Sequence, residues 1–447
     1  MTNILSLPLE LIRRVYDFVL PEDLENLAQS CQYIRSVLEP FLRPHRVLIR
    51  KYKTISNYEQ PQAVGYILQE VLLDPIIGRY VQVLDFVPYE WYFQEVGAET
   101  QYTGEDTSEL GIPAAHVGLP NYEGPRFFDN NEQMLLPIWM THLPNLTSVT
   151  LISSTLRSSG ISRFAEPGPQ IAKPLLPNLK SVVIKNDPGE YNSTCCNLPC
   201  LQVLASIPSV RTITAPGAQH ETSDRMNCGI GPKFSNVTHL NLLETALSSR
   251  LFFEFLRGFI RLESLRYSSQ YTDKATRCPF LIRSGLLVAA KGSLRFLTLL
   301  MPGAQTDTHM GSLGEFEKLE YLETEWDCLV PFRQSPPPMP ALTLPKSIRG
   351  IILHDRKNRK SPPYQRVVDY AISVKHVGVA PHLNLLTFKG FNKVSSPIRA
   401  AMTKQCFARQ IHLDFVDCPT DDLLGEDLSQ TYGKMPEPVF DASDAMA

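Results

Sequence analysis

The sequence lacks the segments that would place it in a membrane or in the secretory pathway. No run of about eighteen uncharged apolar residues occurs among its 447 residues, so we expect no membrane-spanning helix. Glu10, Arg13 and Arg14 interrupt the N-terminus before an apolar segment of signal-peptide length could form. We therefore expect a soluble intracellular protein, in the cytoplasm, the nucleus or both.

Common catalytic signatures are also missing. The chain contains no G-x-S-x-G, no G-x-x-x-x-G-K-[ST] and no H-E-x-x-H, and no G-x-G-x-x-G follows an expected strand. These absences remove the commonest signatures of hydrolases, nucleotide triphosphatases, metalloproteases and dinucleotide enzymes. We expect that the chain is not an enzyme and needs no cofactor. A cryptic enzyme stays an alternative, because a site assembled from distant residues leaves no spacing pattern.

The nine cysteines do not pair at the spacing of a metal site. The densest group is Cys195, Cys196 and Cys200, whereas a structural zinc site uses two such pairs or cysteines with histidines at fixed spacing. Cys228 stands alone further on, with His220 nearby. We therefore expect buried reduced thiols and no metal site.

The chain has little net charge, but the charge is unevenly distributed. The net charge of −3 argues against a dedicated nucleic-acid binder. Residues 89–133 hold nine acidic residues and one basic residue, and residues 419–447 hold seven and one, which leaves the rest of the chain at +11. The first segment also carries many aromatic residues, which favours either a cap for the following domain or an insertion that grips a basic partner. The second segment reads as a solvated acidic tail.

A basic segment lies near the C-terminus and has two interpretations. His354 to Arg366 contains five lysine and arginine residues. It could bind a phosphorylated or acidic target, because guanidinium groups pair with phosphate and carboxylate oxygens. The simpler interpretation is a solvated loop, or a loop that pairs with one of the acidic segments.

The first forty residues show two apolar helical stripes. Leu11, Ile12, Val15, Phe18 and Val19 form the first, and Pro21 stops that helix. The second stripe runs through Leu24, Leu27, Cys31, Ile34 and Leu38, and we expect Pro40 to end it. Helices this short bury little surface alone, so the segment is expected to dock either on the rest of its own chain or on another protein.

This pattern resembles the F-box, a short helical module that binds a Skp-family adaptor in Skp/cullin/F-box ubiquitin ligases. The matching positions are Leu7-Pro8, Glu10-Leu11, Val15, Phe18, Asp23-Leu24, Leu27, Cys31 and Ile34. The resemblance implies that the adaptor is bound by Leu7, Pro8, Leu11, Ile12, Val15, Leu24 and Leu27. For Leu24 and Leu27 the alternative is the core between the two helices.

A short phrase recurs downstream, as in LPNLTSVTL (Leu143 to Leu151) and LPNLKSVVI (Leu176 to Ile184). Its central apolar residues are Val149, Val182, Leu204, Leu240, Leu265, Leu297, Leu322, Ile351 and Leu386. Their spacing is irregular and often exceeds the ~20–29 residues of a leucine-rich repeat. Each phrase predicts a short strand, and the strands must stack on one another to bury their apolar faces. The 36 prolines also favour many short elements joined by turns.

We therefore expect an α+β or α/β solenoid, with an F-box followed by a curved, irregular array that resembles leucine-rich repeats. The expected domains are an F-box-like module at 1–45, a linker helix with a first strand and the acidic aromatic insertion at 46–134, the repeat-like domain at 135–416 and an acidic flexible tail at 417–447. An unrelated α/β domain is the alternative for the repeat-like part. The combination resembles the F-box proteins of filamentous fungi.

The expected function is substrate recognition in a Skp/cullin/F-box ubiquitin ligase. The N-terminal helices would bind the Skp-family adaptor, and through it a cullin, while the open face of the repeats would hold an unknown protein target. The alternatives are an F-box-like scaffold that acts outside a ligase and the cryptic enzyme named above. Neither a nucleic acid nor a membrane is expected as a partner.

Overall fold

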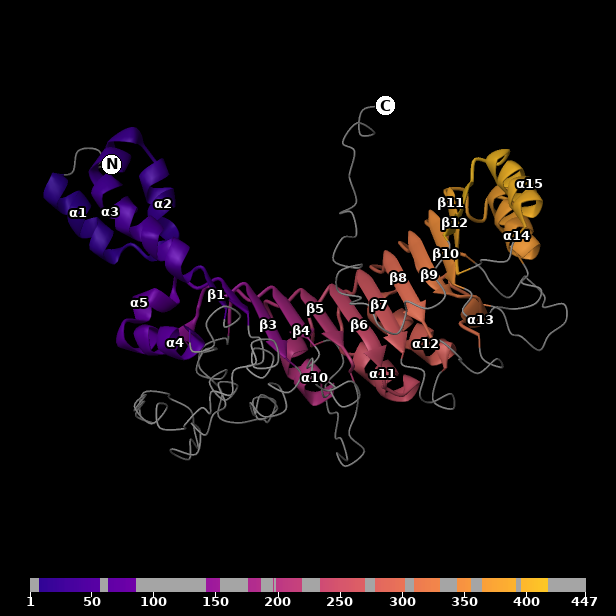
Figure 1. The fold of residues 1–447 in the computed structure, drawn as a ribbon, viewed down its shortest axis with the longest axis horizontal. Coiled ribbons are helices and arrows are strands. Elements are labelled where there is room, and N and C mark those ends of the chain that lie inside the picture. Colours follow the sequence, from indigo (N-terminus) through magenta and orange to yellow (C-terminus); the bar gives the residue numbers. More distant parts are fainter. Residues whose placement is uncertain are drawn as a thin grey trace, which may run out of the picture. The chain divides into compact units, whose positions relative to one another are not determined.

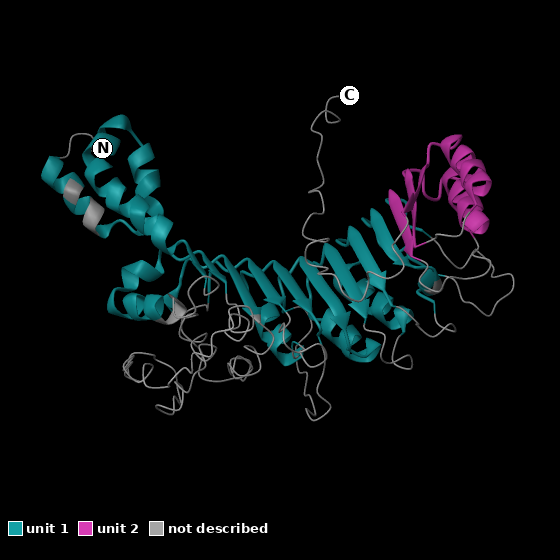
Figure 2. Cartoon of the chain, viewed as in Figure 1, with its two compact units in different colours: residues 1–348 teal, residues 349–447 magenta. Residues whose placement is uncertain are grey.

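The structure is a computed structural model of the whole chain (Figure 1). It describes residues 8–56, 63–85, 142–152, 176–185, 196, 198–218, 234–269, 278–301, 309–329, 344–354, 364–390 and 395–416. The chain divides into two compact units, residues 1–348 and residues 349–447 (Figure 2). The acidic segments 89–133 and 419–447 lie outside the described residues. Over the described residues, no helix combines the length and apolar character needed to cross a membrane.

Three helices open unit 1: α1 (Leu9–Phe18), α2 (Pro21–Gln29) and α3 (Gln32–Tyr52). Pro21 takes the first position of α2, where its missing N–H costs nothing, and the carboxylates of Glu22 and Asp23 follow in the first turn. Cys31 caps α3, because its Sγ accepts a hydrogen bond from the backbone N–H of Ile34 at 3.3 Å.

Pro40 does not end the second stripe, so that expectation is wrong. Helix α3 continues through Pro40 and Pro44 to Tyr52. Both prolines are exposed, and the opposite face buries Ile34 and Leu38. A proline removes a hydrogen bond from a helix, and water can satisfy the freed carbonyl on the exposed face while the apolar face stays packed.

Twelve parallel strands form one sheet, in which they follow one another in chain order. The strands of unit 1 are β1 (Thr54–Ser56), β2 (Val83–Asp85), β3 (Ser148–Ile152), β4 (Ser181–Lys185), β5 (Thr212–Pro216), β6 (His239–Thr245), β7 (Ser264–Ser269), β8 (Phe296–Leu300) and β9 (Tyr321–Glu325). Those of unit 2 are β10 (Gly350–His354), β11 (Leu385–Lys389) and β12 (His412–Val416).

The expected fold class, a curved leucine-rich-repeat-like solenoid, is wrong. The chain forms an open, all-parallel twelve-stranded sheet with helices, which is an α/β arrangement. The physical reason lies in the segments between strands, because they do not repeat one unit. Some contain helices of 8–13 residues and others contain none that the structure describes. The short N-terminal helical region is present as expected.

Helices lie between many of the strands. In unit 1 they are α4 (Ala63–Leu73), α5 (Pro75–Gly78), α10 (Leu198–Ser206), α11 (Ser249–Leu256), α12 (Pro279–Ala290) and the single turn α13 (Trp326–Leu329). Helices α10, α11 and α12 lie along one side of the strands of unit 1 (Figure 1). In unit 2 they are α14 (Tyr364–His376) and α15 (Ser396–Phe407).

One buried row of side chains joins the strands within each unit. In unit 1 the residues in register are Ile55, Leu84, Val149, Val182, Ile213, Leu240, Leu265, Leu297 and Leu322. In unit 2 they are Ile351, Leu386 and Leu413. All of them are buried. Because side chains alternate along a strand, the neighbouring residues lie on the second face of the sheet.

The sheet packs against its helices through aromatic side chains. Phe252 of α11 stacks on Tyr267 of β7 with ring centroids 4.4 Å apart, and both residues are fully buried. Phe255 contacts Phe259 edge to face at 5.1 Å. Aromatic rings bury large areas, so these contacts anchor α11 on the apolar face of unit 1.

The expected domain boundaries compare with the structure as follows. The boundary at 45/46 lies within α3, which continues to Tyr52. The boundary at 134/135 lies outside the described residues. The division between the two compact units, after residue 348, falls inside the segment 135–416 that was expected to form one domain.

Candidate partner-binding faces

Helix α1 presents an outward apolar stripe. Leu11 is 44% exposed and Phe18 is 85% exposed, and Val15 between them is partly buried. Pro8, one turn before Leu11, is also exposed. Because these residues are spaced by three and four positions, they share one side of the helix. Large apolar side chains gathered on one exposed side are typical of a binding surface.

The remaining predicted adaptor residues lie elsewhere. Leu7 is outside the described residues. Ile12 is only 3% exposed and Leu24 is buried as well. Leu27 is partly buried and packs against the core of the helices. The structure therefore gives Ile12, Leu24 and Leu27 a packing role, and it leaves Pro8, Leu11 and Val15 available on the outer side of α1.

The core between α2 and α3 explains this division. Its buried members are Leu24, Ala28, Ile34, Leu38 and Leu42. Around them pack the partly buried residues Val19, Leu27, Cys31 and Phe41. The second apolar stripe of the sequence therefore packs in the core between α2 and α3. One apolar side of α1 is not used by that core and stays exposed.

Phe18 was not among the predicted adaptor-binding residues. Among the α1 side chains whose exposure the structure describes, it is the most exposed large apolar one. The spacing Leu11, Val15 and Phe18 carried the signal, because residues at i, i+4 and i+7 lie on one side of a helix. Leu20 and Tyr33 are further exposed apolar residues of the N-terminal helices.

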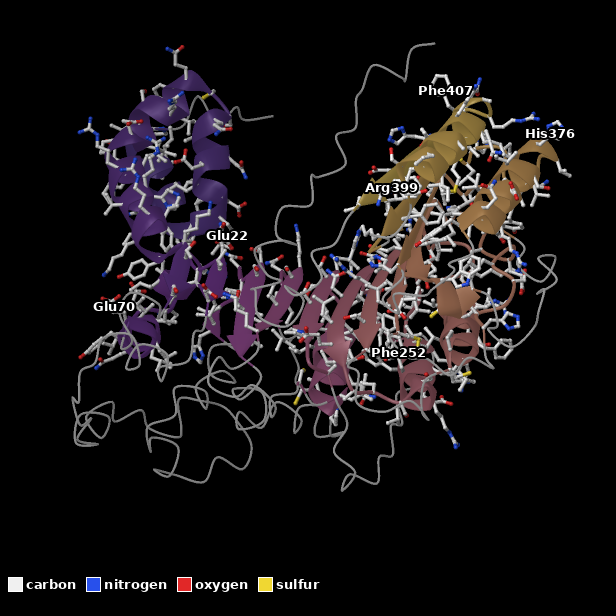
Figure 3. The ribbon with its side chains drawn as sticks, turned by 45° about the vertical axis from the view of Figure 1, so that its right-hand side comes forward. Glu22, Glu70, Phe252, His376, Arg399 and Phe407 are labelled. Carbon is white, nitrogen blue, oxygen red and sulfur yellow. The ribbon has the colours of Figure 1, made fainter. Side chains whose placement is uncertain are left out.

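Ion pairs hold the N-terminal helices together and join them to the start of the sheet. Arg46 of α3 donates to both carboxylate oxygens of Glu25 of α2, at 2.8 and 3.2 Å. This guanidinium lowers the pKa of Glu25. Arg79, which follows α5, pairs with Glu22 of α2. Figure 3 shows Glu22 at the end of the helical bundle that adjoins the first strands.

A second set of contacts links α3 to α4 and to the segment before β2. The Tyr52 hydroxyl donates to Glu70 at 2.7 Å, and Lys51 lies 3.1 Å from the same carboxylate (Figure 3 labels Glu70). The Tyr52 hydrogen bond lowers the pKa of Glu70. His45 Nδ1 lies 3.1 Å from the hydroxyl of Tyr80, and burial lowers the pKa of His45. These contacts hold the helices to the sheet within unit 1.

The second face of the sheet in unit 1 carries mainly polar residues. In register along it lie Thr150, Val183, Thr214, Asn241, Arg266, Thr298 and Glu323. Except for the buried Glu323, they are all partly exposed. Asn241 donates to Thr214 at 3.2 Å, and Thr298 donates to Glu323 at 3.1 Å.

Aromatic residues join this face at β8 and β9. Phe296 and Tyr321 stack with centroids 5.6 Å apart and planes within 5°. Arg295 lies over the Phe296 ring at 5.4 Å and pairs with Glu320 at 2.8 Å. Aromatic rings and arginines supply much of the binding energy in protein interfaces, so this end of the face is its best candidate for a contact with a protein.

The described residues contain cysteines and histidines but no metal-binding cluster. No group of three or more histidine, cysteine, aspartate or glutamate residues within them could hold a metal ion. Burial raises the pKa of the Cys200 thiol to about 11 and that of Cys406 to about 11, so these thiols are protonated and weakly nucleophilic at neutral pH. Cys195, Cys228 and His220 lie outside the described residues.

No protein-family model matches this chain, and no curated protein matches it.

Proposed function

We propose that this chain is the substrate-recognition subunit of a Skp/cullin/F-box ubiquitin ligase. In this proposal the outer side of α1 binds the Skp-family adaptor, and the second face of the sheet in unit 1 holds a protein target. The observation that carries the proposal is the exposed stripe of Leu11, Val15 and Phe18 on the segment whose sequence resembles the F-box.

The energetics of α1 support an adaptor contact. Complete burial of a leucine or phenylalanine side chain contributes about 1.5–3 kcal/mol. Leu11 and Phe18 remain exposed in the chain alone, so much of this burial free energy can still be gained when another protein covers them. A protein that covers both side chains would gain several times the thermal energy from them.

Recruitment requires no chemistry from this chain. Binding the adaptor and the target on one compact unit raises the effective concentration of the target at the ligase. The ion pairs between the N-terminal helices and the first strands support such a role, because they keep both faces on one unit. A subunit of this kind would act in the cytoplasm or the nucleus.

The test is recovery of the full-length chain from cells together with a Skp-family adaptor and a cullin. The informative variants are Leu11→Asp and Phe18→Asp, because both residues are exposed. Ile12→Asp is unsuitable, since it would place a charge in the folded core. A matched control is Phe407→Asp in α15 of unit 2, where the side chain is 82% exposed.

We expect the two α1 variants to recover about tenfold less adaptor, or less still. The reason is that burial of a carboxylate in an apolar contact costs several kcal/mol. The control should retain the adaptor. Equal recovery of the adaptor by all variants would contradict the α1 interface. Recovery of the adaptor without any cullin would instead favour the scaffold that acts outside a ligase.

A further inference from the structure

The described part of unit 2 has more basic than acidic residues. Its described residues include seven lysines and arginines and only two aspartates. Ion pairs between side chains are found within unit 1, but among the described residues of unit 2 no carboxylate pairs with Arg366, Lys404 or Arg409. The described part of unit 2 therefore supplies no carboxylate partner for these three side chains.

Three basic groups converge where α14 and α15 end. Arg409 Nη1 lies 3.3 Å from Nδ1 of His376. Lys375 donates to the carbonyl oxygens of Leu383 at 2.7 Å and Gln410 at 2.9 Å. These contacts place Lys375, His376 and Arg409 close together, so an anion bound here would lie near the Arg409 guanidinium and the Lys375 ammonium.

Exposed apolar side chains flank these groups. Val377 follows His376 directly, and Phe407 lies two residues before Arg409; both are largely exposed. Figure 3 shows His376 and Phe407 at the same end of unit 2. Lys404 precedes Phe407 by three positions and is exposed on the same helix. We call this surface the basic face; it consists of Lys375, His376, Val377, Lys404, Phe407 and Arg409.

The chain carries a segment of matching chemistry. Residues 421–428 read DDLLGEDL and combine four carboxylates with three leucines. They follow β12 closely, because Val416 is the last residue of that strand. Carboxylates suit Lys404 and Arg409, and leucines suit Val377 and Phe407.

The length of the connection is sufficient for the segment to reach the basic face. Gln410 lies just before β12, and Val416 lies at its other end. The segment must therefore return along a five-residue strand, about 17 Å at ~3.3 Å per residue. Eleven extended residues, from Val416 to Asp427, span at most about 38 Å. The acidic residues can therefore reach the cluster from within the same chain, and the short tether gives them a high effective concentration.

We propose that the C-terminal segment 417–447 docks on the basic face of unit 2 of its own chain. Its carboxylates pair with Lys404 and Arg409, and its leucines cover Val377 and Phe407. This inference does not depend on the proposed adaptor function, because it concerns unit 2 alone.

The test is zero-length carbodiimide cross-linking of the full-length chain, with mass spectrometry of the linked peptides. This reagent joins a lysine amine to a carboxylate only when the two are in contact. We expect cross-links between Lys404 and the acidic residues of 421–427. The exposed Lys318 of unit 1 is the reference amine and should give a much lower yield with the same residues.

Tethering alone could favour Lys404, so the second arm reverses one charge on the face. Arg409→Glu leaves Lys404 and the acidic residues intact, and we expect it to lower their cross-link yield about fivefold or more, since it replaces attraction by repulsion. Raising the salt concentration to ~1 M should act in the same direction. The matched control is Arg250→Glu on the exposed side of α11, which should leave the yield unchanged.

Several results would overturn the proposal. One is an equal yield at Lys404 and Lys318, and another is a Lys404 yield that neither salt nor Arg409→Glu changes. A mixture of isotopically light and heavy chains distinguishes contacts within a chain from contacts between chains. Cross-links that join light to heavy chains would show that the segment binds a second copy instead. The melting temperature of Arg409→Glu is measured as a control. A value equal to that of the wild type shows that a lost cross-link does not reflect unfolding.

Discussion

Single residues in unit 1 decide how closely its elements approach. Gly78 ends α5, and a Cβ at this position would lie far inside van der Waals contact of the backbone carbonyl oxygen of His142. Backbone cannot move aside as a side chain can, so the absence of a side chain at residue 78 is a packing requirement. The residue thereby sets how closely the end of α5 approaches the segment before β3.

We expect Gly78→Ala to lower the free energy of unfolding by about 1–3 kcal/mol, the usual cost of overpacking. Gly292→Ala is the control, because its Cβ would meet only Glu317 Oε2 at an ordinary 3.5 Å. The control should change stability by less than about 1 kcal/mol and in the stabilising direction. Urea denaturation measures both variants; similar losses in the two would contradict the close approach at Gly78.

His45 makes the stability of unit 1 depend on pH. Burial lowers its pKa below the usual 6.5, with Arg46 adding to the shift and Glu25 opposing it. The unfolded chain therefore takes up a proton at a pH where the folded chain does not. The stabilisation is fully present above about pH 6.5 and is lost as pH falls through the folded pKa. Glu25 and Glu70, whose pKa values are lowered from 4.5, lose theirs only below about pH 4.5.

We expect the wild type to lose more stability than His45→Gln between pH 6.5 and 4.5. The measurement is the urea midpoint of the two proteins at several pH values in this window. Above pH 7.5 the difference between the two urea midpoints should no longer change with pH. Parallel curves across the window would show that His45 does not titrate with unfolding.

At the scale of elements, a recurring turn explains the recurring phrase. Asn145, Asn178 and Asn236 each donate from Nδ2 to the backbone carbonyl of a preceding turn, at Arg79 (2.8 Å), Pro144 (2.9 Å) and Pro208 (3.0 Å). Each asparagine lies shortly before a strand. Each asparagine side chain thus links the turn before its own strand to the turn before the preceding strand.

Replacing Asn236 by alanine should cost about 0.5–1.5 kcal/mol, the net value of one hydrogen bond. The control is Asn384→Ala in unit 2, an exposed residue before β11 whose backbone rather than its side chain makes the described contact with Arg349. Thermal or chemical denaturation measures the stability of both variants. An Asn236 variant as stable as the control would show that the turn contact contributes nothing.

The sequence predicted most strands because their apolar residues alternate. Val149, Val182 and Leu240 all proved to be central strand residues. Leu204 was assigned wrongly and lies in α10, where residues on every side are buried. A short apolar run that is buried all round shows neither the strand period nor the helix period, so its pattern cannot decide.

The strands around Ile55, Ile213 and Leu413 were missed for a different reason. β1 has only three residues, so it offers one buried side chain and no alternation. β5 and β12 lack the leucine phrase that marked the others. Likewise, the sequence could not say whether Leu11 or Ile12 faces outward, because neighbouring apolar residues fit either orientation until α2 and α3 are in place.

At the scale of the whole molecule, the two proposals assign different contacts to the two units. Unit 1 carries both faces of the proposed recruitment function, the outer side of α1 and the second face of the sheet. Unit 2 carries the basic face and the acidic segment proposed to cover it. In the second proposal, the uneven charge of the sequence reflects a contact within unit 2, whereas the net charge alone indicated little.

The central claim is that the outer side of α1 binds a Skp-family adaptor. The most direct measurement is the dissociation constant of the purified full-length chain for a purified Skp-family adaptor, by calorimetry, for the wild type, Phe18→Asp and Phe407→Asp. The account predicts binding by the wild type and by Phe407→Asp, and at least about tenfold weaker binding by Phe18→Asp. The absence of binding by the wild type, or equal binding by all three proteins, would contradict it.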